Sequence, residues 1–265
     1  MLKIGIPGNA LARWQAEFTQ TELQRIGAES EIVVLDSVEA ALLRGVVQLT
    51  VGAMHRQPVA QPEGLVITAV SRRANPADLL VIRPESVDKT QIFRLKKGAT
   101  VNTTSARQKA QLLDIRPDVD VRATPGDLQQ LHSGAADAIF LEAATVQALG
   151  TDLADLDVLE LHPREFVPAP AQGVLAWLTH RDDLPTRRLL KQLHHSEVSA
   201  LTNVERRVVQ LLDGDASLGV YVERDAAGNY HAFAAAEREG ALQRARLSQN
   251  TNAGLAEKLV AQLQR

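Results

Sequence analysis

A hydroxyl-rich turn between a predicted strand and a predicted helix offers the clearest chemistry in this sequence. Residues 101–117 read VNTTSARQKAQLLDIRP, in which a β run passes through a turn into a helix. Thr103, Thr104 and Ser105 are of types that cap helices, because their side-chain oxygens accept the first amide hydrogens. Amides at a helix N-terminus suit a carboxylate or phosphate, and Arg107 adds positive charge. The pattern predicts either an anion-binding turn or an ordinary strand–cap–helix unit. The spacing alone favours the ordinary unit.

The composition excludes several classes of site and partner. The chain has 265 residues, a net charge of −3, 3% aromatic residues and no cysteine. Without cysteine there can be no disulfide, thiolate metal site or thioether-linked cofactor. The small net charge and scarce aromatics argue against nucleic acid and an anionic membrane as partners. Pro7 and Gly8 interrupt the first apolar segment and no apolar run is long enough to span a bilayer, so we expect a cytoplasmic protein.

Alternating strand and helix patterns predict an α/β fold. The unbroken apolar run 31–35 is typical of a parallel strand that is buried on both faces. The other expected strands are 3–6, 46–51, 65–70, 79–82, 138–141, 173–178, 218–222 and 230–235. A first helix is expected to begin at the turn 7–9 and to run through Leu11, Trp14, Phe18 and Leu23. The other expected helices are 38–43, 106–115, 127–131, 142–149, a long run at 184–212, and 254–263.

Two chain crossings and a change in composition predict three domains. The segments 71–78 and 166–170 resemble crossings between two α/β domains, and the character of the chain changes near residue 182. The expected domains are an α/β domain 1 at 1–72 and 173–195, an α/β domain 2 at 76–168, and a small C-terminal α+β domain 3 at 196–265. Two α/β domains with a cleft between them are a common architecture for binding small anions.

The sequence predicts no metal site. His194 and His195 are neighbours on a predicted helix, where adjacent side chains point in different directions, so a solvated face is favoured over a ligand pair. Asp213 and Asp215 lack the spaced oxygen series of a calcium loop, and Asp213-Gly214 is typical of a turn.

Six motifs, taken in order, resemble the hydroxymethylbilane synthase family, also called porphobilinogen deaminase. They are GNALARWQAE at 8–17, PEGLVITAVSRRANPADLLV at 62–81, VNTTSARQKAQLLDIRPDVDV at 101–121, SGAADAIFLEAA at 133–144, VPAPAQGVL at 167–175 and LGVY at 218–221. The resemblance covers nearly the full length. It implies two α/β domains similar to type-II periplasmic binding proteins and a small third domain. It also implies an enzyme that joins four porphobilinogen units on a dipyrromethane primer held by a cysteine.

The groups that the resemblance assigns to this chemistry are missing. The primer loop corresponds to residues 212–217, where Gly214 stands near the cysteine position, so dipyrromethane cannot attach and we expect no cofactor. Arg56 stands at the position of the family's aspartate, where proton transfer needs a tuned carboxylate. The family's Gly/Lys-rich lid segment, which would lie between Ser37 and Val38, is also missing.

The retained motif residues belong to substrate positioning or to the crossings. The resemblance makes the following residues ligand-binding candidates: Asn9, Gln15, Thr103, Thr104, Ser105, Arg107 and Gln172. We therefore predict a catalytically inactive relative that keeps the scaffold and an anion-binding or tetrapyrrole-precursor-binding cleft. The expected partners are porphobilinogen, a linear tetrapyrrole, a small carboxylate or an enzyme of tetrapyrrole biosynthesis.

Two alternatives remain open from the sequence. The first is an active porphobilinogen-polymerising transferase that uses non-standard residues. The second is a plain binding protein for a small carboxylate, which the positive charge introduced at Arg56, beside His55, would favour.

Overall fold

The computed structural model describes residues 1–264, which divide into two compact units. Unit 1 comprises Met1–Ala74 and Gln172–Ala200, and unit 2 comprises Asn75–Ala171 and residues 201–264. The chain therefore passes between the units three times, and the third passage lies inside helix α7 (Ser196–Leu211). The separation of residues 196–265 as a third domain stays a prediction.

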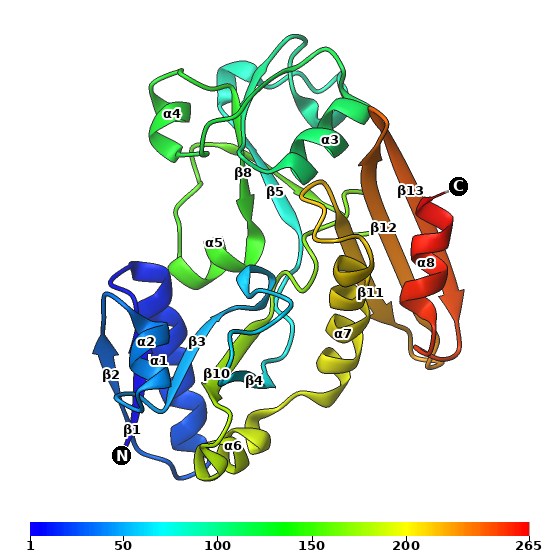
Figure 1. The fold of residues 1–265 in the computed structure, drawn as a ribbon. Coiled ribbons are helices and arrows are strands. Elements are labelled where there is room, and N and C mark those ends of the chain that lie inside the picture. The colour runs from blue at the N-terminus through cyan, green and yellow to red at the C-terminus, as the bar shows by residue number, and fades with distance from the viewer. Residues whose placement is uncertain (265) are drawn as a thin grey trace. The chain divides into compact units, whose positions relative to one another are not determined.

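Unit 1 is built on a mixed five-stranded sheet with the strand order β2-β1-β3-β10-β4 (Figure 1). Strand β1 is parallel to β2 and β3, whereas β10 is antiparallel to β3 and β4. The core of the unit lies against this sheet and includes Ile4, Leu49 and Trp177, whose indole donates to Thr19 Oγ1 at 2.9 Å. The elements are β1 (Leu2–Ile6), α1 (Ala10–Arg25), β2 (Ser30–Val34), α2 (Val38–Leu43), β3 (Leu49–Ala53), η1 (Met54–Arg56), β4 (Leu65–Val70), β10 (Leu175–His180), α6 (Leu184–Leu190) and η4 (Lys191–Leu193).

Unit 2 contains a second five-stranded sheet with the same topology, in the order β7-β6-β8-β5-β9. Strand β6 is parallel to β7 and β8, and β5 is antiparallel to β8 and β9. In each sheet the antiparallel strand is the one that follows a passage between the units, β5 in one case and β10 in the other. The elements are β5 (Asp78–Ile82), η2 (Pro84–Ser86), η3 (Ile92–Arg94), β6 (Thr100–Asn102), α3 (Ala106–Ile115), β7 (Asp120–Arg122), α4 (Leu128–His132), β8 (Ala138–Glu142), α5 (Ala143–Leu149) and β9 (Asp157–Leu161).

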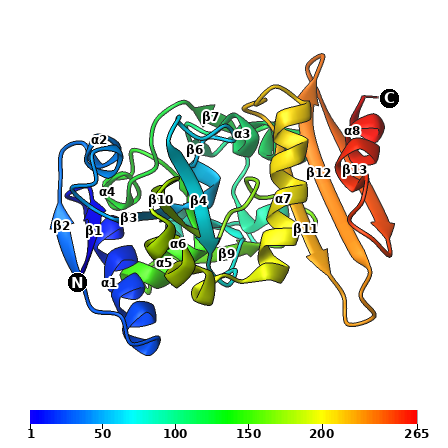
Figure 2. The same cartoon turned by 60° about the horizontal axis from the view of Figure 1, so that its bottom comes forward.

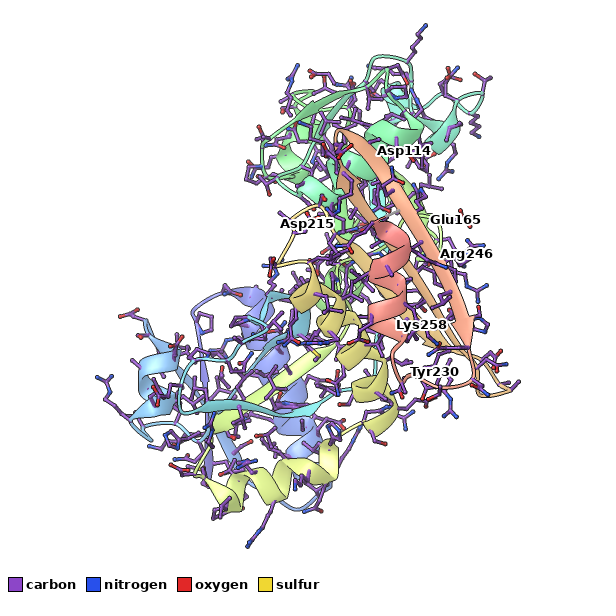
Figure 3. The ribbon with its side chains drawn as sticks, turned by 45° about the vertical axis from the view of Figure 1, so that its right-hand side comes forward. Asp114, Glu165, Asp215, Tyr230, Arg246 and Lys258 are labelled. Atoms are coloured by element: carbon purple, nitrogen blue, oxygen red, sulfur yellow. The ribbon has the colours of Figure 1, made fainter. Side chains whose placement is uncertain are left out.

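An antiparallel three-stranded sheet completes unit 2. It consists of β11 (Gly219–Arg224), β12 (Tyr230–Arg238) and β13 (Ala241–Gln249). Helices α7 and α8 (Leu255–Leu263) share one apolar core with this sheet (Figure 2). Two ion pairs connect β13 to the rest of the unit. Arg244 pairs with Asp114 at 3.2 Å, and Arg246 pairs with Glu165 at 3.4 Å. Arg246 and Glu165 are labelled in Figure 3.

Three expectations about local structure were wrong. Strand β2 is not buried on both faces, because it is the sheet edge, pairs only with β1 and leaves Val34 52% exposed. The helical run 184–212 is broken at His194 and His195, which lie outside the helices. The backbone of His194 is extended, and the two imidazoles accept from the amides of Val70 and Val198, respectively. Strands β7, β9 and β13 were not predicted at all.

Within residues 1–264, no group of three or more His, Asp or Glu side chains could hold a metal ion. In the same range, no helix has the length and apolar character needed to cross a membrane.

Replacing Gly219 by Ala tests the close approach between β11 and Val167, in the segment that leads out of unit 2. A Cβ at Gly219 would lie 2.5 Å from the carbonyl oxygen of Val167, so the backbone must move. We expect Gly219→Ala to lower the apparent Tm by roughly 2–10 °C, as overpacking costs about 1–3 kcal/mol. Gly8→Ala is the control, because its nearest neighbour would be Val34 at an ordinary 3.4 Å. Equal melting of the two variants would contradict this prediction.

Candidate functional site

A cavity of about 460 Å³ in unit 1 brings together three residues that the sequence singled out, Asn9, Gln15 and Arg56. It lies among the start of α1, the end of β3, η1, α2 and the loop that follows η1. The polar part of its lining is Asn9, Gln15, Glu39, Thr50, Arg56, Gln57 and Gln61, and the remainder is mainly aliphatic.

The N-terminal part of α1 places Asn9 and Gln15 in the lining of the cavity. Strand β1 ends at Ile6, and Asn9 caps α1 by accepting the Ala12 amide hydrogen at 2.9 Å. Gln15 lies further along the same helix and is only 6% exposed. Its side-chain amide has no hydrogen-bond partner among residues 1–264, so it is available to a ligand.

Arg56 brings positive charge to the lining. It ends the short helix η1, is exposed, and its Nε donates to His55 Nε2 at 3.3 Å. A guanidinium is permanently protonated and has no acceptor, so it can bind a carboxylate but cannot transfer a proton as an acid with a tuned pKa does.

Thr103 and Ser105, two of the other candidate residues, have hydrogen-bond partners inside unit 2. Ser105 caps α3 by accepting the Gln108 amide hydrogen at 3.3 Å. Thr103 donates to Gln108 Oε1 at 2.5 Å and accepts from the Ser105 amide at 3.0 Å. Thr104 is exposed. The ordinary strand–cap–helix interpretation therefore accounts for the hydroxyl groups of Thr103 and Ser105.

Arg107 is held inside the protein by Asp78. Its side chain is 6% exposed and that of Asp78 is fully buried, and the two form a bidentate pair at 2.7 and 3.2 Å. Gln108 donates to the same carboxylate at 2.8 Å, and Arg107 donates to Val167 O at 2.9 Å. A ligand anion could reach this guanidinium only by displacing Asp78. The sequence did not single out Asp78, because an acid next to a polar crossing is typical of a loop.

Gln172 lies where the chain enters unit 1. It is 1% exposed, and its carbonyl oxygen accepts from Arg73 Nε at 3.0 Å. The neighbouring Gly173 carbonyl accepts from the Ala74 amide at 2.8 Å. Gln172 therefore belongs to the pairing of the two crossings within unit 1.

In the loop around Gly214, the Asp215 carboxylate has hydrogen-bond partners from Ser217 and from Arg238 of β12. Asp213 and Gly214 adopt left-handed φ values of 50° and 74°. Asp215 accepts from the Ser217 amide at 2.7 Å and pairs with Arg238. Burial acts to raise the pKa of Asp215, but hydrogen bonds from Arg238 and Ser217 outweigh it and hold the pKa below its usual range. With no thiol in the loop or elsewhere in the chain, the residues present do not fit a thioether-linked dipyrromethane.

The Asp215 interaction predicts a pH-dependent stability. Because the folded-state pKa is lowered, the carboxylate stabilises the fold above its ordinary pKa, and this contribution is lost as the pH falls through the folded value. Asp215→Asn should therefore melt below the parent protein at pH 7, with a difference that shrinks toward pH 3. Asp213→Asn is the matched control, since Asp213 is exposed and Asn tolerates its left-handed conformation. If the difference in Tm between Asp215→Asn and the parent protein did not change with pH, the ionised Asp215 carboxylate would not be the stabilising group.

Removing Arg107 should destabilise the protein, because the fully buried Asp78 carboxylate loses its ion-pair partner. We expect Arg107→Ala to cost about 3–5 kcal/mol in the unfolding of unit 2, measured by urea denaturation. Arg122→Ala, which removes an exposed pair with Asp120, should change stability by less than about 1 kcal/mol. The double replacement Asp78→Leu/Arg107→Leu should be less harmful than either single change. If Arg107→Ala matched the Arg122 control, the pair would not support the fold.

The two five-stranded sheets of equal topology, with their helices, define an α/β protein, as the sequence predicted. Residues 32–188 match the family model described as porphobilinogen deaminase, dipyromethane cofactor binding domain. The porphobilinogen deaminase of Chloroherpeton thalassium is 32% identical over 247 residues, covering 83% of this chain and 77% of the relative. That of Desulforamulus reducens is 30% identical, covering 86% and 81%. The chain belongs to the porphobilinogen deaminase family.

The chain was also compared with solved structures. The periplasmic binding protein STM4351 of Salmonella typhimurium, described as having high arginine specificity, superposes with a TM-score of 0.45 at 12% identity. The match covers 75% of this chain and 93% of that protein.

Proposed function

We propose that this chain is a porphobilinogen deaminase relative that binds a carboxylate-bearing pyrrole or tetrapyrrole precursor and does not polymerise it. The observation that carries the proposal is the absence of any cysteine in 265 residues. A primer held by a thioether needs a sulfur atom, and the loop that corresponds to the primer site instead satisfies its polar groups internally.

The residue type at position 56, in the lining of the unit 1 cavity, supports the same conclusion. Arg56 occupies the position that the resemblance assigns to an acid, and a guanidinium cannot protonate or deprotonate a pyrrole intermediate. Residues that act together in catalysis lose activity together, so the loss of both the tether and the acid removes the reaction.

The same cavity supports the binding role. Arg56 offers a cation to a carboxylate, Gln15 offers an amide, and the aliphatic lining offers contact to an apolar ring. Arg107 was expected to bind the ligand, but its partners in unit 2 make the unit 1 cavity the better candidate. The proposed cytoplasmic location and a partner enzyme stay predictions.

Incubation with porphobilinogen tests both halves of the proposal. We expect no pyrrole product by absorbance, no covalent mass increase by intact-protein mass spectrometry, and a higher Tm with excess porphobilinogen or a linear tetrapyrrole. A ligand at a hundred times its Kd adds about 2.7 kcal/mol to stability. Arg56→Ala should weaken binding by roughly tenfold or more, as a charged hydrogen bond contributes about 1.5–3 kcal/mol.

Arg13→Ala is the control for Arg56, because Arg13 is exposed on the same unit and pairs with Glu17 outside the cavity. A mass increase corresponding to pyrrole units would refute the loss of polymerisation. An unchanged Tm with every pyrrole carboxylate tried would refute the binding role.

A further inference from the structure

Three polar side chains at one end of the three-stranded sheet form a continuous hydrogen-bonded chain. His231 of β12 and Ser248 of β13 lie opposite each other in the strand register, and His231 Nδ1 is 2.8 Å from Ser248 Oγ. On the other side of the ring, His231 Nε2 lies 3.0 Å from Oδ2 of Asp225, in the loop between β11 and β12. Carboxylate, imidazole and hydroxyl are thus joined in the order that activates a serine. The ring nitrogens are exchanged relative to the commonest serine triad, and either nitrogen can act as the base.

The contacts of Asp225 determine where the protons of this chain lie. Its Oδ1 accepts from the Asn229 amide at 2.8 Å, and its Oδ2 accepts from Asn229 Nδ2 at 3.2 Å. The hydrogen bond from His231, followed by those from Asn229, lowers the pKa of Asp225 to about 2, so this carboxylate is ionised at neutral pH. An ionised carboxylate can only accept, so Nε2 of the neutral His231 ring carries the proton and Nδ1 accepts from Ser248. A serine that donates to a neutral imidazole can lose its proton while its oxygen forms a new bond.

The serine is accessible, whereas the loop that orients the imidazole is held in place. Ser248 is exposed, and the side chain of His231 is 28% exposed. Asp225 and Asn229 are also joined through the backbone, because the Asp225 amide donates to the Asn229 carbonyl at 2.9 Å. An accessible nucleophile behind which a carboxylate is fixed is what acyl transfer requires of these groups.

Positive charge lies on the same face of the strand as the serine. Arg246 precedes Ser248 by two residues on β13, so the two side chains leave the same face. The Arg246 guanidinium lies 5.0 Å from the centre of the Phe233 ring, and its pair with Glu165 is exposed (Figure 3). An exposed pair contributes little stability, so Arg246 can exchange Glu165 for an oxyanion that forms beside Ser248.

We propose that Ser248 is a nucleophile that takes acyl groups from activated esters, with His231 as its base and Asp225 as the positioning residue. The nucleophile belongs to unit 2 and needs no ligand in the unit 1 cavity. As Ser248 Oγ bonds to the ester carbon, its proton passes to His231 Nδ1. The bond from that carbon to the leaving oxygen breaks, and the leaving oxygen takes the electron pair and then the proton.

Water completes the reaction by the same route. It gives a proton to His231 Nδ1 as its oxygen bonds to the acyl carbon, and Ser248 Oγ leaves with the electron pair and recovers the proton. The products are a carboxylic acid and an alcohol. Because Ser248 is exposed to solvent, charge on the oxyanion is stabilised less than in a water-excluded site, so we expect activated esters and not amides to react.

Two reagents test the nucleophile on the full chain. A fluorophosphonate probe should lose fluoride and label Ser248, as mapped by peptide mass spectrometry, and 4-nitrophenyl acetate should release 4-nitrophenolate. Ser248→Ala should remove the label. His231→Gln leaves the serine in place and should slow both reactions by roughly tenfold to a hundredfold, because the base is lost. Asp225→Asn should also slow both, and Asp225→Glu should restore part of the rate, since a carboxylate holds the ring in the required tautomer.

Ser133→Ala is the matched control, because Ser133 is also exposed in unit 2 but its hydroxyl donates to the Gln130 carbonyl at 3.4 Å. It should keep the label and the full rates, and thermal melting shows that each variant is folded. Labelling of Ser248 no faster than that of Ser133 in the parent protein overturns the inference, and this comparison needs no variant. Full rates in folded His231→Gln, or full ester hydrolysis by Ser248→Ala, also overturn it. Each of these results leaves the proposed function standing.

Discussion

The carboxylate of Asp78 and the guanidinium of Arg107 meet in the interior of unit 2, and the segment 166–171 is held by the groups around them. Arg107 also donates to Val167 O, and the same carbonyl accepts from Gln111 Nε2 at 2.9 Å. Gln111 Oε1 in turn accepts the Val167 amide hydrogen at 2.7 Å, so this side chain pairs with the backbone as a strand would. Removing one ion would leave the other charged and buried, which costs far more than an exposed pair contributes. The Asp78–Arg107 pair and its neighbouring hydrogen bonds thus join β5, α3 and the segment that leads out of the unit.

Helix α7 and strand β11 make hydrogen bonds to the same segment. Glu205 of α7 is fully buried, and its two oxygens accept from the amides of Ala171 at 2.6 Å and Val222 at 2.8 Å. Val220 donates to the Pro168 carbonyl at 3.0 Å. Ala171 has a left-handed φ of 68°, a conformation that costs a non-glycine residue free energy and is maintained by these contacts. The geometry of the chain as it leaves unit 2 is therefore set by side chains of α3 and α7 together.

The local sequence pattern predicted the elements that depend on local interactions. It failed for features that depend on how the strands of a sheet pair. The helix at Val38–Leu43 and the stop of α5 at Gly150 follow from periodicity and from a left-handed glycine. The edge position of β2 depends on which strands pair, which no window of residues contains. In the site, Gln15 and Arg56 were found through resemblance alone. Gln61 was not singled out, because only the fold brings its loop and α1 into the lining of one cavity.

The motif residues that persist and those that are absent differ in what they contact. Thr103, Ser105 and Arg107 have partners inside unit 2, so replacing them would leave buried polar groups unsatisfied whether or not the protein has a reaction to perform. Gly214 and Arg56 stand at positions that the resemblance assigns to chemistry, and the loop and cavity around them are compatible with the fold as they are. A requirement to fold would by itself be enough to preserve the similarity to relatives across most of the chain. It is evidence for the scaffold, while function has to be argued from the groups that line the cavity.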